Sequence, residues 1–176
     1  ISSDLVASGI HVLALDLRGF GGSGGEGLSS GFPTLLRKSA SDADLAFDYL
    51  IIQSDVDATR VGVGGASCGG MISADLAVRK GNHIKALMLL SSPPSSNATQ
   101  NAANNSELAV FAAATKQDPI TPGVAGVLES MVNASTNPSS VLRIFDGTEH
   151  GLPMFSSNPT LQPELVNWLK EQLLSE

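Results

Sequence analysis

Short apolar segments recur along the chain, separated by longer stretches in which apolar and polar residues mix. Within the short segments, apolar residues follow one another directly, without the strict alternation of a sheet that has one face in water. Such uninterrupted runs are typical of parallel strands that are covered on both faces. The pattern predicts five strands, at His11–Asp16, Val61–Gly65, Ala86–Ser91, Leu108–Thr115 and Val141–Phe145.

The stretches between these strands have the spacing of amphipathic helices. In one of them, Leu36, Ala43, Phe47 and Leu50 follow one another at intervals of seven, four and three residues, which places them on one helical face. The segment Ser95–Ser106 is polar and low in complexity, so we expect a surface loop there. The predicted helices are Leu35–Ser54, Cys68–Arg79, Pro122–Asn133 and Pro163–Leu174.

Alternating strands and helices in a chain of 176 residues predict one domain, residues 1–176, of the α/β class. We expect a parallel sheet of about five strands, flanked by helices and joined by right-handed crossovers. Apolar residues make up 42% of the chain and charged residues 15%, which supplies a core and argues against disorder.

The composition also disfavours several kinds of partner and site. A net charge of −7 disfavours binding to nucleic-acid phosphates and anionic membranes. No apolar run reaches the roughly 18 residues of a membrane span. Cys68 is the only cysteine, so neither an intramolecular disulfide nor a cysteine-rich zinc site can form. The chain opens at Ile1 rather than Met, so we expect a processed, truncated or cleaved product, and its localisation stays unknown.

The most specific motif places a serine between a predicted strand and a predicted helix. Ser67 lies in Gly65–Gly70 (GASCGG), which contains the pattern G-x-S-x-G. In that context the turn exposes the hydroxyl, small flanking residues prevent clashes, and the helix start directs N–H groups at the same point. We expect Ser67 to be a nucleophile and the backbone N–H of Cys68 to stabilise an oxyanion. Two alternatives are Cys68 itself as the nucleophile and a glycine-rich helix start that only packs against the sheet.

A serine hydroxyl needs a base within hydrogen-bond reach, and the chain holds three histidines. His150 follows the fifth predicted strand, at the end where parallel sheets present reactive groups. We therefore expect His150 to be the general base. His11 begins a strand and His83 lies in a polar turn, so both are expected to be structural or solvated.

The group that orients the base should follow another strand end. Asp118 comes shortly after the fourth predicted strand, and the proline after it disfavours a helix. Its carboxylate would accept from one imidazole nitrogen and leave the other for Ser67. The alternatives are a turn-capping role for Asp118, or Asp146 or Glu149 as the acid, although both lie close to the histidine in sequence.

The glycine-rich segment Gly19–Gly24 matches G-x-G-x-x-G after a predicted strand. A dinucleotide site would need a helix that opens directly from these glycines. The loop instead continues through Gly31, and Pro33 delays the helix further. We therefore expect a rim of the active site or a plain connection rather than nucleotide binding.

Taken together, these motifs resemble the α/β-hydrolase superfamily over nearly the whole chain. Gly9–Ser23 is similar to that family's G-x-x-V-x-x-x-D-x-R-G-x-G-x-S segment, and Gly65–Gly70 to its nucleophile elbow. Asp118-Pro119 and Glu149-His150-Gly151 look like its acid and histidine loops, and Ser, Asp and His occur in the family's order. The residues after the histidine are similar to the dienelactone-hydrolase-like and small esterase branches, of which the serine favours the esterases.

The resemblance also implies strands before Ile1, among them a central strand that lies in the sheet between His11–Asp16 and Val61–Gly65; Ile1–Ser8 is similar to only the end of the helix that follows it. In the family, that strand ends in a loop that supplies the second oxyanion donor. We expect either direct pairing of the two flanking strands, a second copy or second chain that completes the sheet, or a fragment. Buried strand edges without partners are rarely tolerated.

The function that this resemblance implies is hydrolysis of small or soluble carboxylic esters through an acyl-enzyme intermediate. Ser67 would attack, His150 would carry the proton, Asp118 would orient the imidazole, and the Cys68 N–H would bind the oxyanion. No cofactor or metal is implied. The alternative is a non-catalytic α/β-hydrolase-like module, or one chain of a two-chain or fragmented hydrolase. Lactone, thioester and peptide substrates share the same chemistry.

Overall fold

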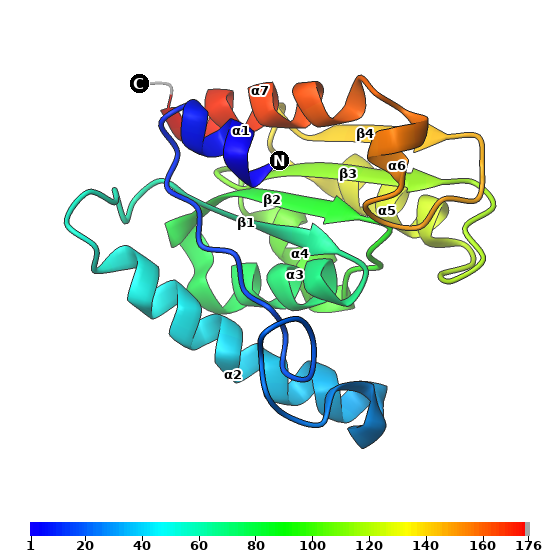
Figure 1. The fold of residues 1–176 in the computed structure, drawn as a ribbon. Helices are drawn as coiled ribbons and strands as arrows, with labels where there is room; N and C mark the ends of the chain where they lie inside the picture. The colour runs from blue at the N-terminus through cyan, green and yellow to red at the C-terminus, as the bar shows by residue number, and fades with distance from the viewer. Residues whose placement is uncertain (175–176) are drawn as a thin grey trace.

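The computed structural model describes residues 1–174 and is built around one parallel sheet (Figure 1). Each strand pairs with the next one along the chain, in the order β1-β2-β3-β4. All four strands therefore end at the same edge, toward the right in Figure 1. The strands are β1 (Val61–Ala66), β2 (Ile84–Leu90), β3 (Ala109–Thr115) and β4 (Val141–Phe145).

Helices cover both faces of the sheet, as the uninterrupted apolar strands predict. One face packs on α2 (Phe32–Ile51), α3 (Cys68–Lys80), α4 (Ser96–Asn104) and α5 (Val124–Ala134). The other face packs on α1 (Ser2–Ala7), α6 (Met154–Ser157) and α7 (Leu161–Leu174). Two short 3₁₀ turns, η1 (Gly27–Ser30) and η2 (Gly81–His83), complete the elements. The predicted α/β architecture, a parallel sheet flanked by helices, is confirmed.

Strand β3 lies at the centre of both cores. All seven of its residues are buried. Val110, Ala112 and Ala114 face the core that α2 to α5 cover, whereas Phe111 and Ala113 face the core under α7. This two-residue alternation between two apolar cores leaves no polar face on the strand. It places the end of β3, and the loop that carries Asp118, in the middle of the edge where the strands end.

The predicted strand His11–Asp16 is wrong, and the sheet has four strands rather than about five. Residues 11–16 form no regular element, and Leu13 and Leu15 are 42% and 45% exposed. A strand is stabilised by the ladder of backbone hydrogen bonds to its neighbours, and the segment has no such neighbour. Within residues 1–174, no strand pairs with the edge of β1 that faces away from β2.

The predicted loop Ser95–Ser106 is also wrong, because most of it forms α4. The hydroxyl of Ser95 accepts a hydrogen bond from the Ala98 N–H (3.2 Å) and caps the helix start. Ala98 and Ala102, one helical turn apart, are buried against the core. The apolar face of α4 consists of these two alanines, and the polar residues around them mask the helical spacing in the sequence.

The glycine-rich segment after residue 18 closes on itself. The Asp16 carboxylate accepts from the Gly22 N–H at 2.8 Å. A Cβ at Gly19 would lie 2.3 Å from the backbone nitrogen of Gly27, so this position must be glycine. The following α-helix begins only at Phe32, which agrees with a connection rather than a phosphate-binding turn.

Candidate active site

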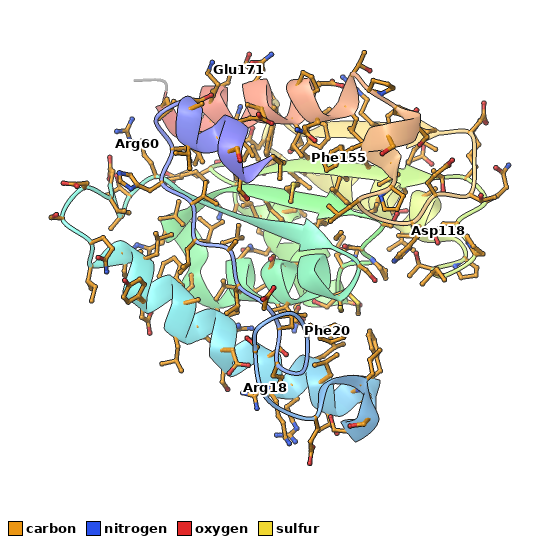
Figure 2. All side chains as sticks on the ribbon, in the orientation of Figure 1. Arg18, Phe20, Arg60, Asp118, Phe155 and Glu171 are labelled. Atoms are coloured by element: carbon orange, nitrogen blue, oxygen red, sulfur yellow. The ribbon has the colours of Figure 1, made fainter. Side chains whose placement is uncertain are left out.

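Ser67 occupies a strained turn between β1 and α3. Its backbone has φ 53° and ψ −127°, a combination that residues with a Cβ rarely adopt. Such strain persists only where the surrounding structure enforces it. The turn lies at the carboxyl end of β1, at the edge of the sheet that also carries Asp118 in Figure 2. Arg60, which precedes β1, lies at the opposite edge.

Two glycines, Gly65 and Gly70, make this turn possible, whereas the motif G-x-S-x-G predicts Gly65 and Gly69. A Cβ at Gly65 would lie 2.5 Å from the carbonyl carbon of Gly69. A Cβ at Gly70 would lie 2.2 Å from the Ser92 Oγ, whereas one at Gly69 would meet nothing within 4 Å. The close approach of helix to strand therefore requires glycine two residues before Ser67 and three residues after it, not two.

The first turn of α3 surrounds Ser67 with backbone donors. The N–H groups of Gly70 and Met71 donate to the Ser67 carbonyl at 3.1 and 3.2 Å. Cys68 is the first residue of the helix, and a helix leaves its first N–H groups without intrahelical acceptors. The Cys68 N–H is thus available to an anion next to the Ser67 side chain. Cys68 itself has helical backbone, so the strained conformation at this turn belongs to Ser67.

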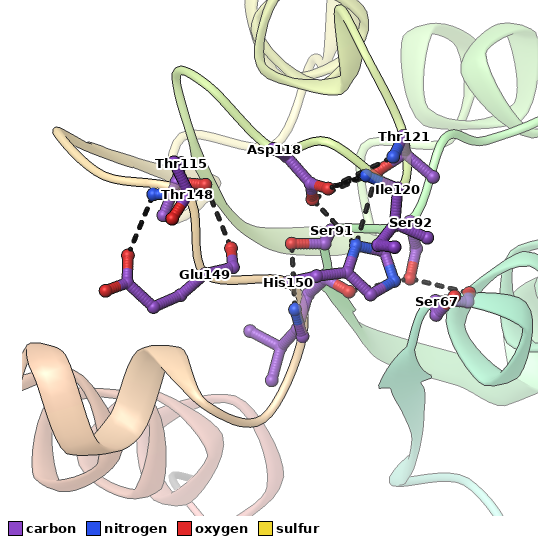
Figure 3. Close-up of polar contacts among 12 residues, drawn as sticks. Ser67, Ser91, Ser92, Thr115, Asp118, Ile120, Thr121, Thr148, Glu149 and His150 are labelled. Atoms are coloured by element: carbon purple, nitrogen blue, oxygen red, sulfur yellow. Dashed lines mark hydrogen bonds and ion pairs between the residues drawn. The ribbon is translucent and has the colours of Figure 1, made fainter.

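The structure brings Asp118 and His150 into direct contact. Asp118 Oδ2 lies 2.7 Å from His150 Nδ1, and a dashed line in Figure 3 marks this contact. Asp118 Oδ1 accepts from the N–H groups of Ile120 (2.9 Å) and Thr121 (3.0 Å), and the Thr121 hydroxyl donates to Oδ2 at 3.0 Å. The carboxylate is therefore held by its own loop as well as by the imidazole.

These contacts fix the charge of Asp118. Burial raises the pKa of the carboxyl, since the residue is only 3% exposed. The hydrogen bonds from His150, from the N–H groups of Thr121 and Ile120, and from the Ser91 hydroxyl outweigh burial and lower the pKa to about 2. Asp118 is thus ionised near neutral pH and can only accept. His150 Nδ1 must then carry the proton of that hydrogen bond, and in the neutral form of the ring Nε2 is therefore an acceptor.

His150 Nε2 is shielded from solvent and has no hydrogen-bond partner among residues 1–174. The expected hydrogen bond from Ser67 is therefore not formed in this conformation. The two residues nevertheless belong to adjoining segments, because a Cβ built on Gly151 would lie 3.2 Å from the Cβ of Ala66. Ala66 precedes Ser67, and Gly151 follows His150. Catalytic hydrogen bonds are often long or unaligned before substrate binds.

The other predicted candidates lie apart from this contact. Asp146 forms an exposed ion pair with Lys116 (2.7 Å), and the Glu149 carboxylate accepts from the Thr148 N–H. His11 and His83 are exposed, and the His83 ring packs edge-on against Phe47 at the far side of the sheet. Within residues 1–174, no three His, Cys, Asp or Glu side chains gather as metal ligands would. No helix in that range is long and apolar enough to cross a membrane.

Sequence reasoning missed three polar residues of the site. Thr121 contacts both Asp118 and His150, the latter with Oγ1 at 3.5 Å from Nδ1. The Ser92 hydroxyl donates to the Ser67 carbonyl at 2.8 Å, and the Ser91 hydroxyl accepts the Gly151 N–H at 3.0 Å. One signal was present: two serines directly follow an apolar strand, at the end of the sheet where His150 and Asp118 were already expected.

Solved structures of hydrolases share this fold. An esterase from Pyrococcus furiosus aligns with a TM-score of 0.73 and 18% identity, covering 97% of this chain and 74% of its own. A monoacylglycerol lipase from Paleococcus ferrophilus aligns with a TM-score of 0.72 and 14% identity, covering 97% and 87%. A dienelactone hydrolase from Anabaena variabilis gives 0.63 and 18%, covering 82% and 64%.

Sequence comparison finds a relative that matches part of the chain and a family model that matches most of it. An uncharacterized protein of Mycobacterium tuberculosis is 38% identical over 72 residues, which are 41% of this chain and 23% of that relative. The chain thus matches about a quarter of the relative's length. The family model described as serine aminopeptidase, S33 matches residues 1–143. With that match over most of the chain and the fold shared with solved hydrolases, the chain belongs to the serine aminopeptidase, S33 family of the α/β-hydrolase superfamily.

Proposed function

We propose that this protein is a serine hydrolase that cleaves carboxylic esters through an acyl-enzyme intermediate. The observation that carries the proposal is the part-buried hydrogen bond between Asp118 and His150, next to the strained turn of Ser67. Membership of a serine hydrolase family supports the same chemistry. Ser67 is the proposed nucleophile, His150 the general base and acid, and Asp118 the group that orients the imidazole.

In the proposed reaction, the Ser67 Oγ attacks the ester carbonyl while its proton passes to His150 Nε2. The carbonyl oxygen becomes an oxyanion, which the Cys68 N–H stabilises at the positive end of α3. The tetrahedral intermediate collapses, and the imidazolium gives its proton to the departing alkoxide. Water then attacks the acyl-enzyme with the same assistance from His150, which releases the acid and restores Ser67. Asp118 stays ionised throughout and stabilises each imidazolium.

Substrates in this proposal are small or soluble esters. The segment after β2 forms α4, which packs against α3 and α5 on one face of the sheet. It therefore does not cover the edge where the strands end and the proposed triad lies. Two large apolar side chains lie exposed in the loops that carry the proposed acid and base: Ile120 is 66% and Leu152 is 58% exposed. An open site with apolar groups at its rim suits a short acyl chain. The esterase and lipase names of the structural neighbours support the ester as the bond cleaved.

Labelling by a fluorophosphonate probe and turnover of p-nitrophenyl acetate test this proposal. The wild-type chain should do both, and Ser67→Ala should do neither. Cys68→Ala is the matched control, because it removes the neighbouring thiol but keeps the backbone N–H. It should retain labelling and most of the turnover. Undiminished labelling of Ser67→Ala would reject the assignment, and loss of labelling in Cys68→Ala alone would make the thiol the nucleophile.

The family description names an aminopeptidase, so peptide cleavage is a second candidate. It uses the same nucleophile, but the leaving amine must be protonated before it departs, and a free substrate N-terminus needs a carboxylate partner. Comparison of p-nitrophenyl acetate with alanine p-nitroanilide separates the two. We expect kcat/KM to be higher for the ester. A higher value for the anilide would assign the peptidase activity.

The open edge of β1 favours another alternative, in which a second chain or second copy completes the sheet. Unpaired strand edges readily accept another strand. Native mass spectrometry of the purified chain tests this alternative. A stoichiometric partner or dimer, with activity only in that state, would support an assembled hydrolase. A monomer that turns over ester would exclude it.

A further inference from the structure

Two serines that directly follow β2 are completely buried although their side chains are polar. Ser91 and Ser92 have no exposed surface. Buried hydroxyls persist in native proteins where hydrogen bonds replace those to water. Ser91 also has φ 50°, and Ser67 is the only other non-glycine residue in the described chain with positive φ. A buried, polar and strained residue at this edge of the sheet points to a role for its hydroxyl.

The Ser91 hydroxyl holds the loop that carries the proposed base. Its Oγ accepts the Gly151 N–H at 3.0 Å in the interior. The dashed line from Ser91 in Figure 3 marks this contact. The same hydroxyl helps to lower the pKa of the Asp118 carboxyl, against the effect of burial. Ser91 thus ties the end of β2 to the backbone next to the imidazole.

This link supplies a constraint that the Asp118–His150 hydrogen bond lacks. That bond holds the imidazole by Nδ1 alone, so the ring could still tilt about this point. The position of Nε2 depends also on where the His150 backbone lies. The Ser91–Gly151 contact holds that backbone one residue away, on the side where Gly151 adjoins Ala66.

Ser92 contacts the turn that carries Ser67. Its Oγ lies 2.8 Å from the Ser67 carbonyl and 3.0 Å from the Leu90 carbonyl. The Ser67 N–H in turn donates to the Leu90 carbonyl at 2.9 Å, so the turn is tied to the end of β2 at two points. The end of β2 therefore anchors both the Ser67 turn and the loop that carries His150.

We propose that Ser91 is a positioning residue of the ester hydrolysis described above: its buried hydroxyl holds the His150 loop by the Gly151 N–H, so that the imidazole stays against Asp118 and Nε2 faces the Ser67 turn. The inference rests on the proposed function. Ser91 does not touch substrate and acts only through the backbone next to His150.

Steady-state kinetics of Ser91→Ala with p-nitrophenyl acetate test this role. A misplaced base slows proton transfer and leaves substrate binding intact, so kcat should fall roughly 10- to 100-fold while KM stays within about threefold. Ser91→Gly also lacks the hydroxyl but tolerates positive φ without strain, so it serves if the alanine variant folds poorly. Both variants should lose kcat to a similar extent.

Ser39→Ala is the matched control. Ser39 is a serine of α2 that is equally buried, and its Oγ has no hydrogen-bond partner among residues 1–174. Its loss should leave kcat and KM unchanged. Recovery of wild-type kcat in Ser91→Gly, or kcat within about twofold of the wild type in both Ser91 variants, would overturn the positioning role.

A second measurement separates this inference from the proposed function. The proton between His150 Nδ1 and the Asp118 carboxylate belongs to a charge-assisted hydrogen bond and should give a separate downfield proton NMR signal. In Ser91→Ala and Ser91→Gly the signal should broaden or shift, and in Ser39→Ala it should not. If the wild-type chain neither labels nor hydrolyses esters, the proposed function fails, and the NMR signal alone decides the link. An unchanged signal in both Ser91 variants would overturn it.

Discussion

Asp118 Oδ2 lies 2.7 Å from His150 Nδ1, although the two residues are 32 positions apart in the chain. The contact forms because β3 and β4 are neighbouring parallel strands that end at the same edge, and each residue lies in the loop that follows its strand. The carboxylate is buried and the imidazole is only 18% exposed, so water screens their interaction little. In the proposed hydrolase, this arrangement orients His150 for proton transfer at Nε2.

Asp118→Asn should lower kcat for p-nitrophenyl acetate by about 10³- to 10⁴-fold. The amide cannot stabilise an imidazolium, and it can donate to Nδ1 and so favour the wrong tautomer. KM should change little, because Asp118 does not touch the substrate. Stopped-flow or steady-state ester turnover measures the effect.

Asp146→Asn is the control for this change. Asp146 also follows β4, but its side chain is 86% exposed and pairs with Lys116. Exposed ion pairs contribute little, so activity should stay within about twofold of the wild type. If Asp146→Asn were the more damaging of the two changes, Asp118 would not be the orienting acid.

The depressed pKa of Asp118 also predicts a stability that depends on pH. Hydrogen bonds outweigh burial and lower the folded-state pKa to about 2, below the ordinary value of 3.8. A group whose pKa is depressed on folding stabilises the protein above its unfolded pKa. That stability is lost as the pH falls from about 4 through about 2, and it amounts to about 2 kcal/mol.

Urea unfolding at several pH values checks this prediction. Between pH 5 and pH 2, the free energy of unfolding of the wild type should fall by about 2 kcal/mol more than that of Asp118→Asn. Asp57 also has its pKa lowered to about 2, chiefly by hydrogen bonds from Thr59, but it contributes equally to both proteins and cancels. Parallel pH curves for the two proteins would contradict the depressed pKa.

The sheet and the proposed triad could be predicted because each depends on local signals. An apolar run marks a strand whose two faces are buried, and Val141–Phe145 was predicted with the bounds that the structure gives. Ser67, Asp118 and His150 each follow such a strand, and parallel strands bring their carboxyl ends together whatever the loops contain. Sequence order alone therefore placed the three residues at one edge.

Three of the errors have a different physical origin, because they depend on which residues are neighbours in the folded chain rather than in the sequence. His11–Asp16 has the composition of a strand, but a strand needs a neighbour to pair with. Ser91 is indistinguishable in sequence from a serine that ends a strand, and only the fold places Gly151 opposite its hydroxyl. The same holds for glycine spacing after Ser67, where the position of Ser92 decides which residue must lack a side chain.

Gly70→Ala should destabilise the protein by about 1–3 kcal/mol, the range for overpacking a filled interior. The added Cβ would lie 2.2 Å from the Ser92 Oγ and 2.8 Å from the Gly65 carbonyl oxygen. Either the helix moves away from β1 or Ser92 releases the Ser67 carbonyl. Urea unfolding gives the stability change, and fluorophosphonate labelling, which should slow, reports on the turn.

Gly69→Ala is the matched control in the same helical turn. A Cβ there would meet nothing within 4 Å, and alanine favours a helix over glycine. The variant should be as stable as the wild type, or more stable by up to about 1 kcal/mol. Equal destabilisation by both changes would mean that the close approach of α3 to β1 is not what requires glycine.

Strain at Ser67 predicts that loss of the side chain can stabilise the protein. Ser67→Ala and Ser67→Gly both remove the hydroxyl, but only glycine adopts φ 53° and ψ −127° without steric cost. Relief of strain is worth about 1–3 kcal/mol, and the greater freedom of glycine in the unfolded chain offsets about 0.4–1 kcal/mol. Ser67→Gly should therefore be more stable than Ser67→Ala by about 1 kcal/mol in urea unfolding, and both should be inactive. If alanine were the more stable of the two, the turn would hold no strain, and the conformation of Ser67 would need another cause.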